Sequence, residues 1–151
     1  MKNYIRFAIM ILTSTVIMYF LMYLNVFEIS HATFSETRLY MALIMGSVMA
    51  IVMLLFMWKM YKNKRANAII LAVAAVTFGA SLWLVRSQTL VDDTSWMSAM
   101  IPHHSIAILT SERANLTNPE VQELADEIIE AQKREIDEMK ELIEEIEAEE
   151  E

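Results

Sequence analysis

The segment WMSAMIPHHS, residues 96–105, combines thioether and imidazole side chains at helical spacing. On an α-helix, which advances about 100° per residue, Met97, Met100 and His104 fall within about 60° of one another. His103 points about 100° away from His104 on the same helix. The chain has no cysteine. Thioether and imidazole ligands suit Cu(I) or Ag(I), because soft ligands select soft ions.

The same residue types also suit a purely structural role. Methionine commonly fills gaps in helix cores, and a histidine near Pro102 can satisfy the backbone carbonyl that a proline leaves without a donor. We expect Pro102 either to kink the helix over residues 98–102 or to lie in the first turn of a new helix. A di-iron site is disfavoured, because it needs Glu three residues before each His, where this chain has Met100 and Ile101.

Charge divides the chain into two unlike halves. Residues 1–90 carry eight Lys/Arg and two Asp/Glu, a net of +6. Residues 91–151 carry four Lys/Arg and eighteen Asp/Glu, a net of -14. We therefore expect an all-α protein with a three-helix transmembrane domain, residues 1–88, and an extracytoplasmic helical hairpin with an acidic tail, residues 89–151.

Three uncharged runs predict the membrane helices: Phe7–Phe27, Leu39–Trp58 and Ala66–Val85. Each is long enough for a hydrocarbon core about 30 Å thick, and backbone groups in lipid must bond within a helix. The first run is expected to be a retained signal anchor, because no small-residue cleavage site follows it. The basic 58–65 loop places the N-terminus in the cytoplasm and residues from about Arg86 outside it.

Capping residues predict the hairpin. A first helix begins near residues 92–95, and a second begins at Pro119 behind Thr117 or Asn118. With the turn centred near residue 116, Met97 is level with about residue 135, so Met139 can reach Met97 while His104, near level 128, lies too far away. The acidic tail is then expected to bend away, fray or be disordered. The predicted apolar face is Val121, Leu124, Ile128, Ile136, Met139, Ile143 and Ile146.

That apolar face needs a partner, because one hairpin buries little apolar surface. Two hairpins in a four-helix bundle, or three about an axis, would bury it, so we expect a homo-oligomer with four-helix-bundle-type packing. The acids between the apolar positions, such as Glu127, Glu130 and Glu135, are expected to form the solvated face. Glu130 or Glu135 is a further candidate to approach a metal.

A second methionine series lies in the membrane. Packing is the favoured role for it, because Gly46 and Ala50 form a small-xxx-small pair on the same segment. A soft-ion relay towards His31 is the alternative, although His31 itself is expected to be a solvated loop residue. The series recurs every four residues: Met41, Met45, Met49, Met53 and Met57.

Other chemistries lack their residues. The two glycines, Gly46 and Gly79, both lie inside membrane runs, so there is no glycine-rich phosphate loop. No nucleophile–base–acid set is apparent, and the acidic outer half repels nucleic acid. The expected protein is therefore a binder without catalytic turnover and without a nucleic-acid partner.

The segment DDTSWMSAMIPHHSIAILTSERA, residues 92–114, resembles a bacterial family, the domain of unknown function 305. The hallmark of that family is a Met-Ile-Pro-His-His block after an aromatic-Met pair. LADEIIEAQKREIDEMKEL, residues 124–142, is similar to the second helix of the family. The matching positions are Trp96, Met97, Met100, Ile101, Pro102, His103 and His104, then Ala131, Gln132, Glu135, Ile136 and Met139.

The resemblance implies a helical, ferritin-like protein of the bacterial inner membrane, related to periplasmic copper-binding proteins. It implies copper for Met97, Met100, His103, His104 and Met139. Ser105 departs from the family, since many relatives continue with glutamine there. We expect an extracytoplasmic Cu(I) or Ag(I) binder in copper handling or tolerance. The alternatives are an oligomeric membrane scaffold or partner-binding module with structural histidines, and a part of a metal conduit.

Overall fold

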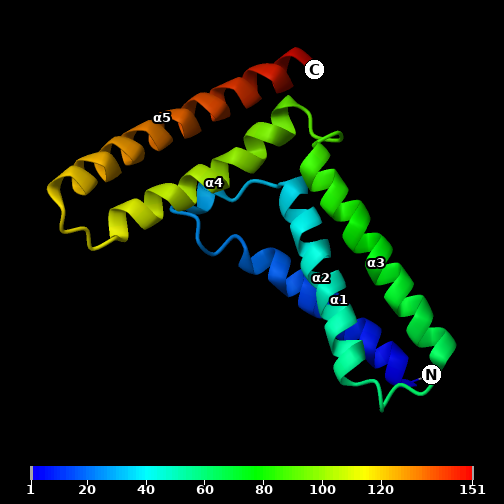
Figure 1. Cartoon of the computed structure of the whole chain (residues 1–151). Coiled ribbons are helices and arrows are strands. Elements are labelled where there is room, and N and C mark those ends of the chain that lie inside the picture. The colour runs from blue at the N-terminus through cyan, green and yellow to red at the C-terminus, as the bar shows by residue number, and fades with distance from the viewer. Residues whose placement is uncertain (1, 151) are drawn as a thin grey trace. The chain divides into compact units, whose positions relative to one another are not determined.

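The computed structural model describes residues 2–150, which form α-helices without a β-strand among them (Figure 1). The all-α prediction is confirmed. A short 3-10 helix, η1, Ile29–His31, lies between the first two α-helices. The α-helices are α1 Lys2–Leu21, α2 Glu36–Phe56, α3 Lys64–Ser87, α4 Asp93–Arg113 and α5 Pro119–Glu150.

The chain forms two compact units. The membrane-helix unit comprises Met1–Met22 and Thr37–Leu90, and the hairpin unit comprises Tyr23–Glu36 and Val91–Glu151. We had expected the α1–α2 loop to belong with the membrane helices. In the structure this loop packs with the hairpin instead, and its contacts there are described below.

Helices α1, α2 and α3 are each long and apolar enough to cross a membrane. The predicted first run was wrong at its C-terminal end, because α1 ends at Leu21 and not at Phe27. Phe27 packs against the apolar cluster of the hairpin unit, and its amide donates to Ser105 Oγ at 2.6 Å. The hairpin cluster thus partly buries the Phe27 side chain and Ser105 accepts from its amide, and α1 ends before this residue.

Aromatic and amide groups join the helices of the membrane-helix unit at one end. Tyr4 Oη donates to Asn67 Oδ1 at 2.8 Å, and Asn67 Nδ2 donates to the carbonyl of Tyr61 at 2.8 Å. Asn67 is buried, so both bonds offset the cost of removing its amide from water. The ring of Phe7 meets the ring of Tyr61 edge to face at 5.3 Å. This end of α1 is therefore held against the start of α3.

Gly46 allows α1 to approach α2 closely. A Cβ at this position would overlap Thr15 Oγ1, whereas a Cβ at Gly79 would meet nothing within 4 Å. Ala50, four residues after Gly46, is buried in the apolar cluster around Phe7. The small-xxx-small pair thus lies where two helices pack. The predicted methionine series is partly buried or exposed.

Alanine at Gly46 is therefore expected to destabilise the protein, because Thr15 must move to admit the new methyl group. Gly79→Ala is the matched control and should be neutral or stabilising by up to about 1 kcal/mol, since alanine is the better helix former. Thermal unfolding of the full-length protein in detergent measures both changes. An equal midpoint shift for the two variants would show that α1 and α2 do not touch at Gly46.

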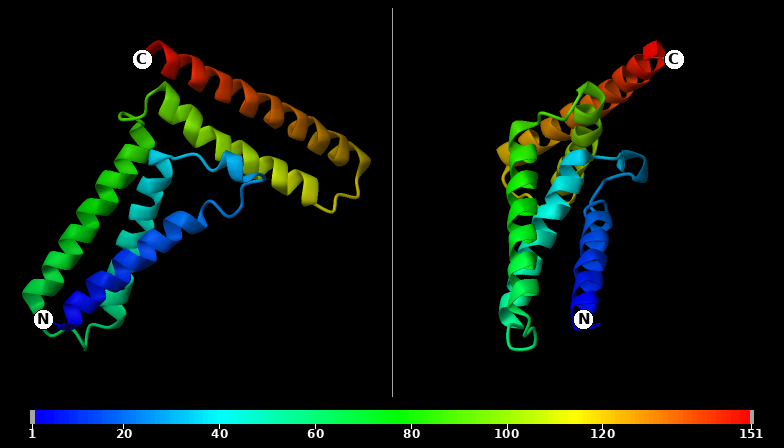
Figure 2. Two further views of the ribbon diagram at one scale, coloured as in Figure 1. Left: turned by 180° about the vertical axis from the view of Figure 1, so that it is seen from behind. Right: turned by 90° about the vertical axis from the view of Figure 1, so that its right-hand side faces the viewer.

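Helices α4 and α5 run antiparallel, side by side, in the hairpin unit (Figures 1 and 2). Asp92 caps α4 by accepting from the Ser95 amide at 2.8 Å, and this bond lowers the pKa of Asp92. Asn118 Oδ1 accepts from the Glu120 amide at 2.9 Å, and α5 begins at Pro119. Both predicted helix starts are confirmed.

The structure excludes one of the two alternatives at Pro102 and corrects the expectation for the acidic tail. Helix α4 is continuous through Pro102, so no new helix begins there. Helix α5 continues to Glu150, so the described part of the acidic tail is helical. Its apolar positions Ile143 and Ile146 pack on the cluster that contains Met97, and this packing keeps the end of α5 against α4.

Only the second half of the predicted apolar face of α5 packs on α4. Val121, Leu124 and Ile128 are 44%, 55% and 37% exposed. The side that packs on α4 alternates steps of four and three residues, which is the spacing of a coiled-coil seam. Its buried and half-buried members are Ala125, Ile129, Gln132, Ile136, Met139, Ile143 and Ile146.

Candidate metal centre

Three of the predicted thioether ligands lie in one apolar cluster of the hairpin unit. Met97 and Met139 are 6% and 7% exposed, and they share the cluster with Ile101 and Ile136. Met100 is partly buried and packs against it. The structure therefore brings together thioethers from both helices of the hairpin. Cluster packing alone accounts for their burial, because methionine is a flexible gap filler.

His104 extends from α4 to α5 beside this cluster. Its Nδ1 lies 2.9 Å from the Met100 carbonyl, and its Nε2 lies 2.8 Å from Glu135 Oε2. Carbonyl and carboxylate oxygens both accept hydrogen bonds, so each ring nitrogen faces an acceptor. The bond to the Met100 carbonyl requires a proton on Nδ1, because a carbonyl oxygen only accepts hydrogen bonds. Glu135 also accepts from Gln132 Nε2 at 3.3 Å.

The contact with Glu135 corrects the predicted register. We had placed His104 level with about residue 128 and Glu135 on the solvated face. Side chains of a helix lean towards its N-terminus. In an antiparallel pair His104 therefore leans away from the turn while Glu135 leans towards it, but each lean covers only about one residue position. The Nε2–Oε2 distance of 2.8 Å thus also requires a register different from the one predicted.

His103 is not part of this arrangement. It is exposed, whereas His104 is half-buried. The centroids of the two rings are 6.2 Å apart, with planes at 66°. The two adjacent histidines thus lie in different environments, as their separation of about 100° around the helix predicts.

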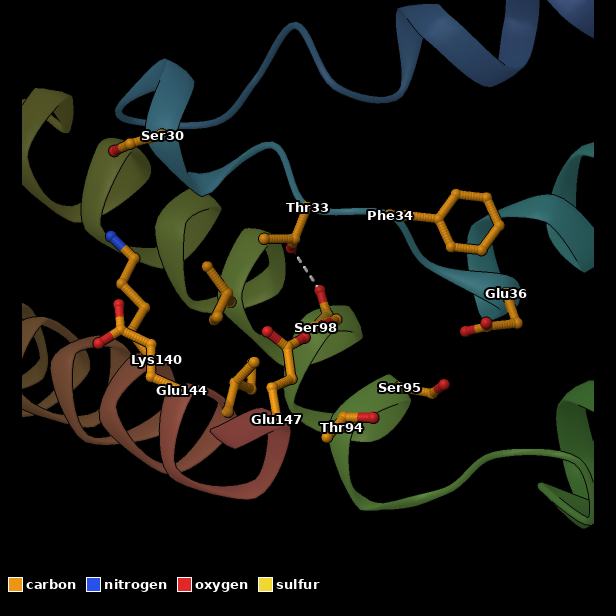
Figure 3. A pocket seen from close by; sticks show the side chains of 12 residues that line it. Ser30, Thr33, Phe34, Glu36, Thr94, Ser95, Ser98, Lys140, Glu144 and Glu147 are labelled. Atoms are coloured by element: carbon orange, nitrogen blue, oxygen red, sulfur yellow. Dashed lines mark hydrogen bonds between the residues drawn. The ribbon is translucent and has the colours of Figure 1, made fainter. Parts of the chain in front are cut away.

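Pro102 leaves the Ser98 carbonyl without its helix donor, because proline has no N–H. Thr33 Oγ1 from the α1–α2 loop donates to this carbonyl at 2.6 Å (Figure 3). The hypothesis that a histidine satisfies the freed carbonyl is therefore wrong. The hydrogen bond that the Ser98 carbonyl lacks comes from a threonine distant in sequence.

His31 is buried, not solvated as predicted. It is 7% exposed, and its Nδ1 lies 3.0 Å from Ser105 Oγ, which also accepts from the Phe27 amide. Burial lowers the pKa of His31, and the nearby ammonium of Lys140 acts in the same direction. The carboxylates of Glu28 and Asp137 oppose this shift. Ser105, which is fully buried, thus anchors the α1–α2 loop on α4.

A pocket of about 410 Å³ lies between the α1–α2 loop, α4 and α5 in the hairpin unit (Figure 3). None of the five predicted ligands lines it. Eight of its twelve lining residues carry a hydroxyl or a carboxylate, and Lys140 adds an ammonium group. The lining residues are Ser30, Thr33, Phe34, Glu36, Thr94, Ser95, Ser98, Ile101, Lys140, Ile143, Glu144 and Glu147.

Within residues 2–150, no group of three or more His, Asp or Glu side chains is placed to hold a metal ion. The contacts missed from the sequence are those of Thr33, His31, Phe27 and Ser105. One signal was available: Pro102 identified the Ser98 carbonyl as an acceptor in need of a donor. Nothing in the local sequence of residues 27–33 indicated that this segment would supply it.

Fold and site together define an all-α protein with three helices long and apolar enough to cross a membrane and a helical hairpin that carries a Met/His cluster. Residues 89–151 match the family model described as Domain of unknown function (DUF305). An uncharacterized protein of Acanthamoeba polyphaga mimivirus is 33% identical over 108 residues, which cover 70% of this chain and 69% of the viral protein. The chain belongs to the DUF305 family.

The viral match is longer than the family match, so the similarity extends beyond the hairpin into residues before 89. No solved structure matches the chain significantly.

The lowered pKa of His31 predicts that the α1–α2 loop is held less tightly in acid. The undocked loop has the higher histidine pKa, near 6.5, so it takes up more protons as the pH falls below that value. Docking is therefore strongest above about pH 6.5 and weakens as the pH falls below that value. Hydrogen exchange at the Phe27 amide, corrected for the intrinsic rate, measures this change.

His31→Asn is the control for that measurement, because asparagine does not titrate in this range. Its Phe27 protection should vary little with pH after the same correction. If wild type and His31→Asn lost protection in parallel, another group would control the docking of the loop.

Proposed function

We propose that this protein is a membrane-anchored binder of Cu(I) or Ag(I), without catalytic turnover. The observation that carries the proposal is the clustering of Met97, Met100 and Met139 between α4 and α5, with His104, one turn after Met100, bonded across to α5. These thioethers and the imidazole are soft or borderline ligands, and the thioethers pack among apolar side chains. The proposed ligand from the adjacent pair is His104 and not the exposed His103.

The hydrogen bonds of His104 support its role as a ligand. The Met100 carbonyl holds the Nδ1 proton, a pattern that orients many metal-binding histidines and leaves Nε2 for the ion. The ion would take the place of the contact between Nε2 and Glu135. The Glu135 side chain is 42% exposed and accepts a hydrogen bond from Gln132. Its carboxylate would therefore stay solvated and hydrogen-bonded after its contact with His104 is broken.

The proposed location is the outer face of a bacterial inner membrane, with the N-terminus in the cytoplasm. The basic 58–65 loop supports this orientation through the positive-inside rule. Three crossings then place the α1–α2 loop and the hairpin on the same side of the membrane. The bonds from Thr33 and Phe27 to α4 need that arrangement, and copper handling or tolerance is the role proposed there.

Titration of the full-length protein in detergent with Cu(I), against a chromogenic chelator, tests the proposal. Met100→Leu/His104→Ala should weaken binding by at least about 100-fold, since loss of second-shell partners alone costs 10–100-fold. His103→Ala is the matched control and should bind like wild type. Wild-type affinity should also fall with decreasing pH, because the proton competes for Nε2. Equal, weak binding by all three proteins would refute the copper site.

A homo-oligomeric scaffold is the second candidate, and one observation favours it. Val121, Leu124 and Ile128 form an apolar stripe on the exposed side of α5. A second hairpin packed on this stripe would complete a four-helix bundle. The proposed oligomer is compatible with copper binding, because the stripe lies outside the Met/His cluster.

Leu124→Glu should lower the oligomeric mass in light scattering of the detergent-solubilised protein, because a carboxylate would be buried in the interface. Arg134→Gln changes the net charge equally from an exposed position outside the stripe and should leave the mass unchanged. Ile136 is unsuitable for this test, since it is 1% exposed inside the hairpin and a charge there would unfold it. A monomeric wild type would rule out the oligomer.

A further inference from the structure

An apolar groove of about 630 Å³ lies between α1, α2 and α3 in the membrane-helix unit. The wall is mainly aliphatic, and none of the five methionines of the series from Met41 to Met57 lines it. Two hydroxyls in the wall bond within their own helices: Thr15 Oγ1 donates to the Ile11 carbonyl at 2.8 Å, and Ser47 Oγ donates to the Leu43 carbonyl at 2.6 Å. The groove thus offers hydrocarbon contact and satisfied hydroxyls.

The length of the groove is that of one membrane leaflet. On α1 it runs from Tyr4 to Thr15 and on α3 from Ala66 to Thr77, eleven steps along each helix. At 1.5 Å per residue this is about 16 Å, roughly half of a hydrocarbon core about 30 Å thick. A lipid chain has this reach, whereas a second transmembrane helix would need a groove along the whole thickness.

The Tyr4 and Ala66 end of the groove is strongly basic. The start of α1 and the α2–α3 turn lie together at this end of the unit (Figures 1 and 2), joined by the bond from Tyr4 to Asn67. The membrane-helix unit contains no Asp or Glu, so its cations have no carboxylate within the unit. The exposed cations at this end are Lys2, Arg6, Lys59, Lys62, Lys64 and Arg65.

From these observations we propose that the groove binds one anionic phospholipid. An acyl chain lies along α1 and α3, and the phosphate headgroup meets Lys62, Lys64 and Arg65. Basic pockets between membrane helices are suited to anionic headgroups. The site is independent of the Met/His cluster, and it gives α1 a partner along the stretch where that helix is otherwise largely exposed.

Native mass spectrometry of the full-length protein in detergent tests this site. Delipidated protein is mixed with equal amounts of phosphatidylglycerol and phosphatidylcholine that carry identical acyl chains. The expected spectrum shows one phosphatidylglycerol retained in preference to phosphatidylcholine. Arg65→Gln should lower this preference roughly fivefold, from about 1 kcal/mol per basic residue near a membrane surface.

Two further variants separate the headgroup from the chain. Arg86→Gln removes an exposed cation from the other end of α3 and should leave the preference unchanged. Val73→Phe should abolish retention of both lipids, because Val73 lines the groove and is 60% exposed, so the larger ring fills the groove without disturbing the core. Circular dichroism of each variant checks that the helices remain folded.

Four results would overturn the proposal. Equal retention of the two lipids by the wild type would exclude an anionic site. Equal effects of Arg65→Gln and Arg86→Gln on the lipid preference would mean that a positive charge at either end of α3 attracts the anionic lipid equally. Undiminished lipid retention by folded Val73→Phe, or a dimer that forms as lipid leaves, would assign the groove to another occupant.

Discussion

The constraint on which the hairpin unit depends is the missing N–H of Pro102. A proline inside a helix leaves one carbonyl without a donor, and a buried carbonyl in that state is costly. Thr33 supplies the donor to Ser98, and this bond holds the α1–α2 loop on α4. Ser105 then receives the Phe27 amide and the ring of His31 from the same loop. A local backbone deficit is thus satisfied by a segment more than 60 residues away in the chain.

The two sides of α4 use histidine and serine differently. On one side, Ser105 and the buried His31 secure the loop. On the other, His104 bonds to Glu135 beside the methionines. Adjacent positions on a helix point about 100° apart, so neighbouring residues take unrelated roles. The same separation leaves His103 exposed, although it is the residue next to His104 in the sequence.

Much of this fold could be predicted from residue type and spacing. Uncharged runs predicted the three apolar helices, and Asp92 and Asn118 predicted where the hairpin helices begin. Capping and hydrophobic length act within a few residues, so they can be recognised locally. The candidate site was less accessible. The exposed Leu124 and the pairing of His104 with Glu135 depend on helix register and side-chain tilt, which apolar periodicity alone does not specify.

What the sequence determined by itself is the set of elements and the chemical inventory: helices of membrane length, a hairpin, and a soft-ligand segment from Met97 to His104. Only the tertiary structure decided which donors meet which acceptors. It placed Thr33 on Ser98, buried His31, and extended α5 along α4 to Glu150. The physical reason is the range of the interactions. Capping and hydropathy involve neighbours in the chain, whereas a freed carbonyl or a buried imidazole takes its partner from whichever segment the fold brings close.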